Sequence, residues 1–312
     1  MNSTICTLFE GDYHFGVGAL VNSLYKYGFR GTIWVGYRGS LPPWAKNLME
    51  NPEYKDCEIA EGCIVRFLPL TTTAHFTNYK PTFMLDILRK YDPGANQLFY
   101  FDPDIVIKCR WTFYEEWCSR GIALCQEIVN AYMPSNHPVR LAWKDMGEKE
   151  GFEIARELNQ YFSGGFIGVR RDHASIIEVW KTLLDNVWKY DVDISKFSAA
   201  PDRSSTILSP DQDLLNLAAM ITPDPLSTIG PEGMAFVPGG FTMAHAVGRP
   251  KPWRKKMLRE AVRGKATTAA DKEYLLNVRE PIRLYTEQEL VRRSFDARCG
   301  AALGRVMRRS QS

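Results

Sequence analysis

The apolar residues of the first hundred positions follow two alternating patterns. Short runs rich in β-branched and aromatic residues are typical of strands. They alternate with segments in which apolar residues recur every three or four positions, as on one face of a helix. The predicted strands are Thr4–Phe9, Thr32–Tyr37, Cys63–Leu70 and Gln97–Phe101. The predicted helices are Val17–Tyr27, closed by Gly28, then Pro42–Met49, and then Pro81–Tyr91, opened by its proline. Strands that alternate with helices predict an α/β domain with a mainly parallel sheet.

The pattern in the second half of the chain is more mixed. Strands are predicted at Gly121–Gln126 and Gly165–Val169, whereas residues 222–250, rich in Gly and Pro, predict loops and short strands. Two helices are predicted at Asp213–Met220, behind a proline, and at Glu287–Met307. Another helix, capped by Asp172, carries an apolar stripe at helical spacing. The stripe consists of Ile176, Trp180, Leu183, Leu184 and Val187.

Composition excludes several classes of protein. The 312 residues are 45% apolar and 24% charged, unlike disordered, collagen-like or disulfide-scaffold proteins. No run approaches the roughly 18 consecutive apolar residues of a membrane span. The first residues contain Glu10 and Asp12 but no basic segment, so no secretory signal is expected. The seven cysteines are scattered, without a Cys-x-x-Cys pair, and indicate free thiols in a reducing, cytoplasmic compartment.

Charge is distributed unevenly, although the net charge is only +3. Residues 249–312 contain 17 Lys and Arg against 7 Asp and Glu, so residues 1–248 contain 22 against 29. Such a basic tail can be solvated, bind an anionic membrane surface or, least expected here, bind nucleic acid. Because no nucleic-acid-binding module is recognisable in the body, we expect no nucleic-acid partner. The segment Glu287–Met307, with arginines between apolar residues, fits a basic amphipathic helix on a membrane as well as a helix docked on the body.

The most informative polar motif is Asp102-Pro103-Asp104, directly after the predicted strand Gln97–Phe101. Ligands of open α/β sheets bind at the carboxyl ends of the strands. Two carboxylates two residues apart can share a Mg²⁺ or Mn²⁺ ion that also holds a diphosphate. Pro103 would restrict Asp102 to extended conformations. The alternative is an ordinary strand-ending turn.

A second motif lies in the Gly/Pro-rich segment and runs from His245 through Gly248 and Lys251 to Trp253. It could supply an imidazole ligand and an ammonium group for phosphate. Each residue also has a plain structural explanation, as a core or surface side chain. The loop context favours function, because neither helical packing nor strand alternation accounts for these residues.

Two further motifs are weak by themselves. Asp211-Gln212-Asp213, after Pro210, fits the acidic first turn of a helix, or polar groups for ligand hydroxyls. Ser163-Gly164-Gly165, at the entry to a strand, fits a tight turn, or a place where a ligand approaches the backbone closely.

Together these motifs resemble the retaining glycosyltransferases of family 8, whose GT-A fold is shared by glycogenin and bacterial lipopolysaccharide galactosyl- and glucosyltransferases. The resemblance covers about Thr4 to Trp253, and the motifs occur in the family's order. The final motif is the most specific, and its pairing with Asp-x-Asp is hard to obtain by chance. The motifs are Asp12-Tyr13, Ser23-Leu24, Tyr79-Lys80, Asp102-Pro103-Asp104, the Gly164-Gly165 strand entry, Asp211-Gln212-Asp213 and His245-x-x-Gly248-x-x-Lys251-Pro-Trp253.

The resemblance implies a role for each matching residue. Metal ligands for Mn²⁺ or Mg²⁺ would be Asp102, Asp104 and His245, and Lys251 with the turn at Gly248 would hold the leaving diphosphate. Asp211 would hold sugar hydroxyls, and Gln212 would lie beneath the anomeric carbon. The remaining donor-site residues would be Thr7, Asp12 and Tyr13 around uridine, Lys80 at the sugar and phosphate, and Pro103, Ser163, Gly164, Gly165 and Trp253.

Three positions depart from the family pattern. Ser163 stands where asparagine is frequent, so the donor sugar is less defined. Lys80 replaces an arginine and gives a point charge in place of a planar fork. Pro103 lacks the backbone N–H that other members can turn toward the ribose.

The resemblance implies a metal-dependent retaining transferase that moves a hexose from a UDP-sugar to an acceptor hydroxyl of a saccharide, a lipid-linked sugar or a protein. A GT-A catalytic domain is expected over residues 1–255, followed by a basic, mostly helical extension over 256–312. The protein is expected in the cytoplasm, where the extension could contact the inner face of a membrane. Two alternatives stay open: a nucleotide-sugar-binding pseudoenzyme or partner subunit, and a metal-dependent nucleotide phosphohydrolase.

Overall fold

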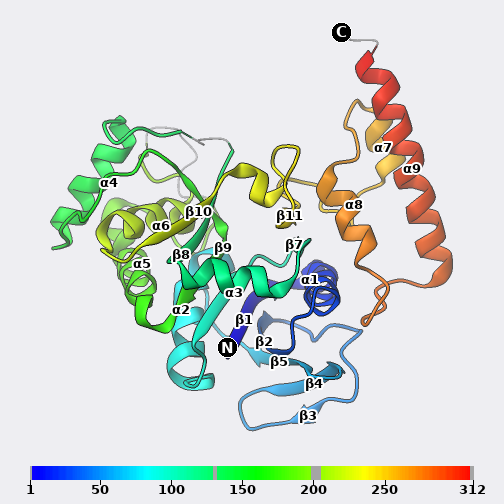
Figure 1. Cartoon of the computed structure of the whole chain (residues 1–312), viewed down its shortest axis with the longest axis horizontal. Helices are drawn as coiled ribbons and strands as arrows, with labels where there is room; N and C mark the ends of the chain where they lie inside the picture. The colour runs from blue at the N-terminus through cyan, green and yellow to red at the C-terminus, as the bar shows by residue number, and fades with distance from the viewer. Residues whose placement is uncertain (1, 129–131, 198–204, 310–312) are drawn as a thin grey trace.

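The computed structural model describes residues 2–128, 132–197 and 205–309, with side chains up to residue 303 in the last helix. Within these residues, nine strands form one sheet in the order β10-β8-β9-β6-β1-β2-β5-β4-β3 (Figure 1). Strands β4 and β9 run opposite to the other seven, so the sheet is mixed but mainly parallel. The strands are β1 (Ser3–Glu10), β2 (Gly31–Arg38), β3 (Met49–Glu50), β4 (Lys55–Ala60), β5 (Cys63–Pro69), β6 (Gln97–Phe101), β8 (Ile122–Gln126), β9 (Phe162–Arg170) and β10 (Leu226–Ile229).

Helices cover both faces of this sheet. The described part of the chain contains α1 (His14–Lys26), α2 (Phe76–Asp86, continued by a wider turn over Ile87–Tyr91), α3 (Trp111–Ser119), α4 (Pro138–Lys149), α5 (Ser175–Asn186), α6 (Pro210–Ile221), α7 (Met257–Val262), α8 (Ala269–Leu276) and α9 (Glu287–Arg309). Short helical turns lie at Gly11–Tyr13, Arg171–His173, Val187–Tyr190 and Pro231–Met234. None of these described helices is both long enough and apolar enough to cross a bilayer.

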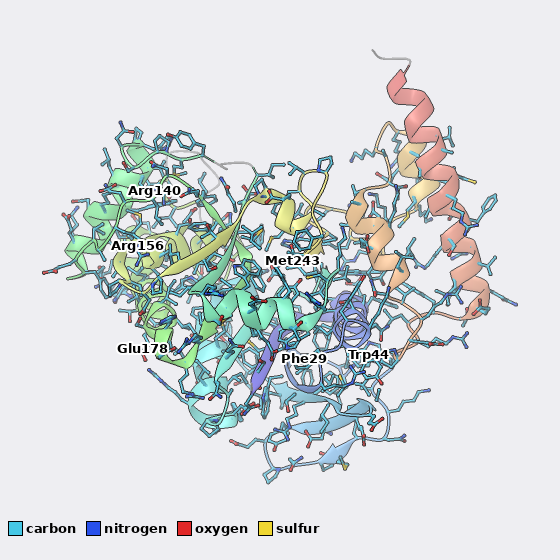
Figure 2. The ribbon with its side chains drawn as sticks, in the orientation of Figure 1. Phe29, Trp44, Arg140, Arg156, Glu178 and Met243 are labelled. Carbon is cyan, nitrogen blue, oxygen red and sulfur yellow. The ribbon has the colours of Figure 1, made fainter. Side chains whose placement is uncertain are left out.

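Successive side chains along each strand point to opposite faces of the sheet, so the core has two halves, one on each face. In β1, Cys6 and Leu8 join the cluster under α2, α4, α5 and α6, whereas Ile5 and Phe9 join the cluster under α1 and α3. Because both faces of the central strands are covered, these strands are almost continuously apolar. Arg140 of α4 (Figure 2) is also fully buried, and its guanidinium donates to the Gln160 carbonyl at 2.7 Å.

A small two-stranded ribbon lies beside the sheet. It pairs β7 (Ile105–Ile107) with β11 (Met243–His245) in antiparallel fashion, with His245 opposite Ile105. The Ser23 hydroxyl of α1 accepts a hydrogen bond from the Ile107 N–H at 3.0 Å. This contact ties the ribbon to the sheet's first helix.

The C-terminal helices α7, α8 and α9 form a group at one end of the molecule, beside α1 and opposite α4 (Figure 1). A third apolar cluster joins α8 and α9 to α1 and to the ribbon. Asn22 of α1 is buried within this contact, and its amide group bonds to Asn277 and to both backbone groups of Ile282 at 2.7–2.9 Å. The third cluster contains Ala19, Val106, Ala244, Trp253, Ala270, Tyr274, Val278, Tyr285 and Leu290.

Most of the predicted strands are confirmed, and Gln97–Phe101 matches β6 at both ends. Gly28 closes α1 with a positive φ of 93°, the conformation for which glycine is suited. The helix predicted at Pro42–Met49 is wrong, because this segment forms turns that lead into β3.

The starts of three other helices differ from the prediction. Pro81 lies inside α2, which begins five residues earlier, after its His75 cap. Asp172 does not cap α5: it lies in the preceding turn and pairs with Arg170, and Ala174 stands at the N-cap. The proline at 210 is the first residue of α6 rather than a residue before it, as suits its fixed φ.

Candidate active site

A cavity of about 450 Å³ opens at the carboxyl edge of the parallel strands. The ends of β1, β6 and β8 meet the beginning of β9 here, since β9 runs in the opposite direction. The sequence-predicted residues that line it are Tyr13, Lys80, Asp102, Pro103, Asp104, Ser163, Gly164, Gly165, Asp211, Gln212, His245, Gly248 and Lys251. The segments that carry these residues are far apart in the sequence, and the topology brings them together.

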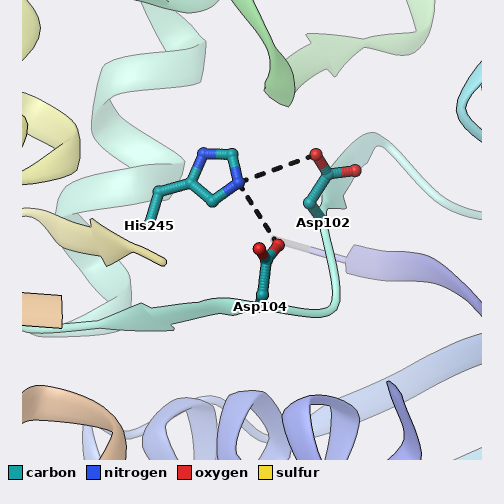
Figure 3. Close-up of side chains that lie close together, drawn as sticks. All are labelled: Asp102, Asp104 and His245. Atoms are coloured by element: carbon teal, nitrogen blue, oxygen red, sulfur yellow. Dashed lines mark ion pairs between the residues drawn. The ribbon is translucent and has the colours of Figure 1, made fainter. Parts of the chain in front are cut away.

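Asp102, Asp104 and His245 converge on one point of this cavity (Figure 3). The Nε2 atom of His245 lies 3.2 Å from an oxygen of Asp104 and 3.8 Å from an oxygen of Asp102. One potential ligand atom from each residue lies within 4.8 Å of the others. A tight turn, in which the Ile105 N–H donates to the Asp102 carbonyl at 3.0 Å, aims both carboxylates the same way.

The β7–β11 ribbon brings the histidine to the two carboxylates. His245 ends β11 opposite Ile105, and the Ala246 N–H donates to the Asp104 backbone carbonyl at 3.0 Å. From the other side, Gly165 of β9 leaves room for the imidazole. A Cβ at Gly165 would lie 2.6 Å from the His245 ring and 3.1 Å from a carboxylate oxygen of Asp102.

This group fits a divalent cation. Two carboxylates and one imidazole are a donor set suited to Mn²⁺, and the carboxylates also suit Mg²⁺. Asp104 and His245 are buried, and Asp102 is partly exposed toward the cavity, so other positions around an ion stay accessible to a ligand. The three side chains can therefore hold a metal ion.

Lys251 lies beside the same group and forms an ion pair with Asp104. Its ammonium also donates to the Ala246 carbonyl at 2.9 Å. Burial alone would raise the pKa of the Asp104 carboxyl, but His245 and Lys251 outweigh burial and hold the pKa well below its ordinary value. Asp104 is therefore ionised, as a metal ligand must be.

Lys80 occupies the opposite side of Asp102 and is almost completely buried. Its ammonium lies 2.9 Å from Asp211, 3.0 Å from Asp102 and 2.8 Å from the Gly164 carbonyl. Burial alone would lower the pKa of Lys80, but the two carboxylates outweigh burial and raise the pKa above its ordinary value. Lys80 thus links α2, β6, β9 and α6 as a fixed cation.

Asp211 and Gln212 stand in the first turn of α6 and face the start of β9. The Gln212 side-chain carbonyl accepts a hydrogen bond from the Gly164 N–H at 2.8 Å, and the Ser163 hydroxyl accepts one from the Gly165 N–H at 3.2 Å. A Cβ at Gly164 would lie 2.9 Å from the Asp211 carboxylate. Glycine at this position therefore lets β9 and α6 approach closely, whereas the sequence motif predicted a tight turn or the close approach of a ligand.

Behind these residues is a buried polar layer that sequence reasoning did not assign to the site. The Tyr161 hydroxyl donates to Asp213 at 2.5 Å, and the second Asp213 oxygen accepts the N–H groups of Leu208 and Ser209. Asn216 bonds to both backbone groups of Phe162 at 2.8 Å. Buried polar residues in the helix Pro210–Ile221 were the signal for this layer, because a purely structural helix would bury apolar side chains there.

Three of the predicted donor-site residues do not line the cavity. Thr7 is fully buried within β1. Asp12 forms a bidentate ion pair with Arg254, whose guanidinium lowers the pKa of that carboxyl. Trp253 packs its ring edge-on against Tyr13, with 5.1 Å between the ring centroids. Asp12 and Trp253 thus surround Tyr13, which does line the cavity.

The cavity also includes residues that the sequence analysis did not propose. They come from loops after β5 and β8 and around α5 and β11, with no shared motif. His75 caps α2, and burial lowers the pKa of its imidazole. The others include Phe76, Glu127, Phe197, Ser209, Phe236, Val247 and Arg249.

No protein-family model and no curated protein sequence matches the chain. Among solved structures, it is similar to the WbbM bifunctional glycosyltransferase, with a TM-score of 0.55 and 14% identity over 93% of this chain and 51% of that one. It is also similar to the glycosyltransferase GlyE of Streptococcus pneumoniae TIGR4, with a TM-score of 0.50 and 12% identity over 95% of this chain and 64% of that one. The chain thus spans about half of the first structure and less than two thirds of the second.

The fold is therefore the mixed, mainly parallel α/β fold found in glycosyltransferase structures. Identities of 12–14% extend the likeness to the fold alone. The predicted fold class is confirmed, and assignment to family 8 stays a prediction.

Proposed function

We propose that this protein is a metal-dependent retaining glycosyltransferase of family 8 that moves a hexose from a UDP-sugar to an acceptor hydroxyl. One observation carries the proposal: Asp102, Asp104 and His245 converge at the strand-end cavity of a glycosyltransferase fold, with Lys251 paired to Asp104. A donor diphosphate needs such a set of groups, because metal and ammonium together balance its charge.

The charged groups of the cavity suggest that one side stabilises the leaving diphosphate and the other side stabilises the sugar ring. Breaking the sugar–phosphate bond leaves negative charge on the diphosphate, which Lys251 can meet from its place beside Asp104. A bound Mn²⁺ or Mg²⁺ would supply Lewis-acid stabilisation of that same leaving group. Positive charge develops on the sugar ring, which Asp211 and the Gln212 carbonyl can meet, and both are held in place by Lys80 and Gly164.

The donor pocket proposed from the resemblance is supported unevenly by the contacts. Tyr13, Gly248 and Pro103 lie in the cavity wall and can contact the uridine diphosphate directly. Because Thr7, Asp12 and Trp253 do not line the cavity, they would support the lining residues without contacting the donor. For Ser163, the hydroxyl bonded to the Gly165 N–H is also available to a donor sugar.

The test is a screen of UDP-sugars for UDP release with Mn²⁺, followed by a screen of acceptors with the best donor. Asp104→Asn and His245→Ala should abolish UDP release, whereas His173→Ala, outside the cavity lining, should not. UDP–Mn²⁺ binding without release would indicate the pseudoenzyme, and phosphate release independent of acceptor would indicate the phosphohydrolase. Either result would overturn the proposed transfer.

We also propose that α9 brings the enzyme to an anionic membrane surface, which implies a cytoplasmic protein that is peripheral on the inner face. Val291 and Phe295 are about 60% exposed on α9, and Arg292 and Arg298 are exposed beside them. Each basic residue near an anionic surface contributes about 1 kcal/mol. The side chains of Arg305, Val306, Met307, Arg308 and Arg309, part of the same sequence prediction, lie outside the described residues.

Liposome flotation tests this membrane proposal. Phe295→Asp combined with Arg298→Glu should lose binding to anionic vesicles and keep donor hydrolysis. Wild-type protein that fails to float with anionic vesicles would end the proposal.

A further inference from the structure

The segment that carries Lys251 has the C-terminal helices directly behind it. Trp253, two residues after Lys251, is buried in the third apolar cluster, where its ring lies 5.8 Å from that of Tyr274 in α8. The Tyr274 and Tyr285 hydroxyls share a hydrogen bond of 2.7 Å, and Tyr285 stacks on Phe15 of α1 at 5.3 Å. The wall of the cavity at Lys251 therefore rests on side chains from α8 and from the residues before α9.

The side chain of Arg293 in α9 contacts the backbone of the segment that carries Lys251. The guanidinium donates to the Trp253 carbonyl at 3.1 Å and lies 4.2 Å from the centre of the Tyr285 ring. Arg283, in the segment before α9, is instead exposed and pairs with Glu287. Arg293 thus joins α9 to a backbone atom two residues from the catalytic lysine.

Lys255 and Asp271 form a second tie. Their side chains are 2.5 Å apart and only 10% and 4% exposed. Asp271 also belongs to the capping box at the start of α8, where it accepts the Thr268 N–H at 2.8 Å. The Asp271 carboxylate is therefore held by the helix cap as well as by Lys255. The adjacent Lys256 is exposed.

We propose that Asp271 and Arg293 are positioning residues that hold the Lys251 segment in its place at the diphosphate, so that the C-terminal helices are part of the catalytic machinery. This inference rests on the proposed function. Lys251 can stabilise the negative charge on the leaving diphosphate only if its backbone is held in place. Displacement of such a group by about 1 Å can lower the rate a hundredfold. Because that charge develops in the transition state, the loss should fall on kcat rather than on KM.

The experiment compares Arg293→Ala with the matched control Arg283→Ala, which removes an exposed arginine before α9, after circular dichroism has shown that both are folded. Arg293→Ala should lower kcat by roughly tenfold or more with a nearly unchanged donor KM. Arg293→Lys, which retains a donor for the Trp253 carbonyl, should restore part of kcat. Lys255→Met should behave like Arg293→Ala, with Lys256→Met as its control.

Hydrogen exchange of residues 249–257 provides a readout that does not depend on catalysis. Exchange should rise in Arg293→Ala and Lys255→Met and stay at the wild-type rate in the two controls. Unchanged exchange and unchanged kcat in both variants, or an equal loss in the controls, would overturn the positioning role. If the wild type transfers no sugar but exchange still rises in the two variants, the tie is supported and the proposed function fails.

Discussion

Asp104 contacts both His245 and Lys251, and this double contact explains why so short a motif can organise the site. Its carboxylate is 5% exposed, so each partner acts with little screening by water. An isolated charge buried to this extent would be costly, and the two partners offset that cost. Replacement of any of the three residues should therefore affect the other two.

Lys251→Ala is expected to slow turnover more than it weakens binding of the uridine end. A charge-assisted contact of this kind contributes ~1.5–3 kcal/mol, or roughly tenfold to more than a hundredfold in rate. Steady-state kinetics with varied donor give kcat and KM separately. Lys256→Ala, which removes an exposed lysine five residues away, is the control, and equal turnover in both variants would remove Lys251 from the mechanism.

Asp213 is expected to make stability depend on pH. Burial raises the pKa of its carboxyl to about 6 in the folded protein, above the ordinary value of 3.8. A raised folded pKa favours the protonated form, so this contribution is fully present below pH 3.8 and is lost as the pH rises through about 6. The loss amounts to at most about 3 kcal/mol.

Asp213→Asn should flatten this pH profile, because the amide can accept the two backbone N–H groups without ionising. Denaturant unfolding between pH 4 and pH 8 measures it. Asp191→Asn, at an exposed turn, should retain the wild-type profile. A profile for Asp213→Asn as steep as that of the wild type would contradict the assignment.

The sequence could indicate Asp102, Asp104 and His245, because motif and loop context singled them out. The geometric convergence of these three residues is found in the structure. The sequence could not predict that the Lys80 ammonium bonds both to Asp211 and to a β9 carbonyl, because a contact across 131 positions has no local pattern. Such contacts are set by the order of strands in the sheet.

The β7–β11 ribbon shows how an element of six residues can set the geometry of a site. It fixes His245 over the carboxylates, and Gly165 of β9, without a side chain, leaves room for the imidazole on the far side. Strand β7 was not predicted, and β11 was predicted only as one of the unplaced short strands of residues 222–250, because three-residue strands are too short to show alternation. The motif residues were recognisable, but the element that aligns them was not.

Gly165→Ala is therefore expected to weaken Mn²⁺ binding while the fold remains. The new methyl group would lie 2.6 Å from the His245 ring and would push the imidazole out of line. Disturbing the support of a metal ligand typically costs 10–100-fold in affinity, which a calorimetric titration would detect. Gly94→Ala is the control, since its nearest neighbour would be 3.8 Å away. Wild-type affinity in Gly165→Ala would contradict this packing argument.

Elements with strong local patterns were predictable, and those determined by tertiary contacts were not. Strand β6 is apolar or aromatic at every position after Gln97, and its bounds were predicted to the residue. The segment Pro42–Met49 has the composition of a helix, yet Trp44 donates its indole N–H to the His14 carbonyl at 3.0 Å and is held in a turn. Tertiary packing overrides helix propensity at this point.

Metal binding should stabilise the whole molecule. An ion that binds only the folded state raises the free energy of unfolding by about 2.7 kcal/mol at a hundred times its dissociation constant. Thermal unfolding of the wild type should therefore shift upward with added Mn²⁺ and return when EDTA is added. Asp104→Asn and His245→Ala should show near-wild-type circular dichroism and no such shift. A shift retained in either variant would remove that residue from the metal site.

The mixed, mainly parallel sheet was predictable in class from the alternation of strands and helices. The position of β9 between β6 and β8, with reversed direction, was not, because its pairing is fixed by packing against α3 and α6. The division of the chain at residue 255 stays a prediction. The contacts of Asn22 with residues 277 and 282 show how closely the C-terminal segment is bound to the first helix.

These Asn22 contacts also bear on synthesis. A growing chain emerges with its N-terminus first, and Asn22 must wait 255 to 260 residues for its partners. Closing so long a loop carries an entropic cost, so this contact belongs to a late stage of folding. Until then, the Asn22 amide and one apolar flank of α1, which the complete fold buries, remain exposed, and other chains or chaperones can bind them. A ribosome that stalls before residue 282 would leave a sheet whose first helix is still uncovered.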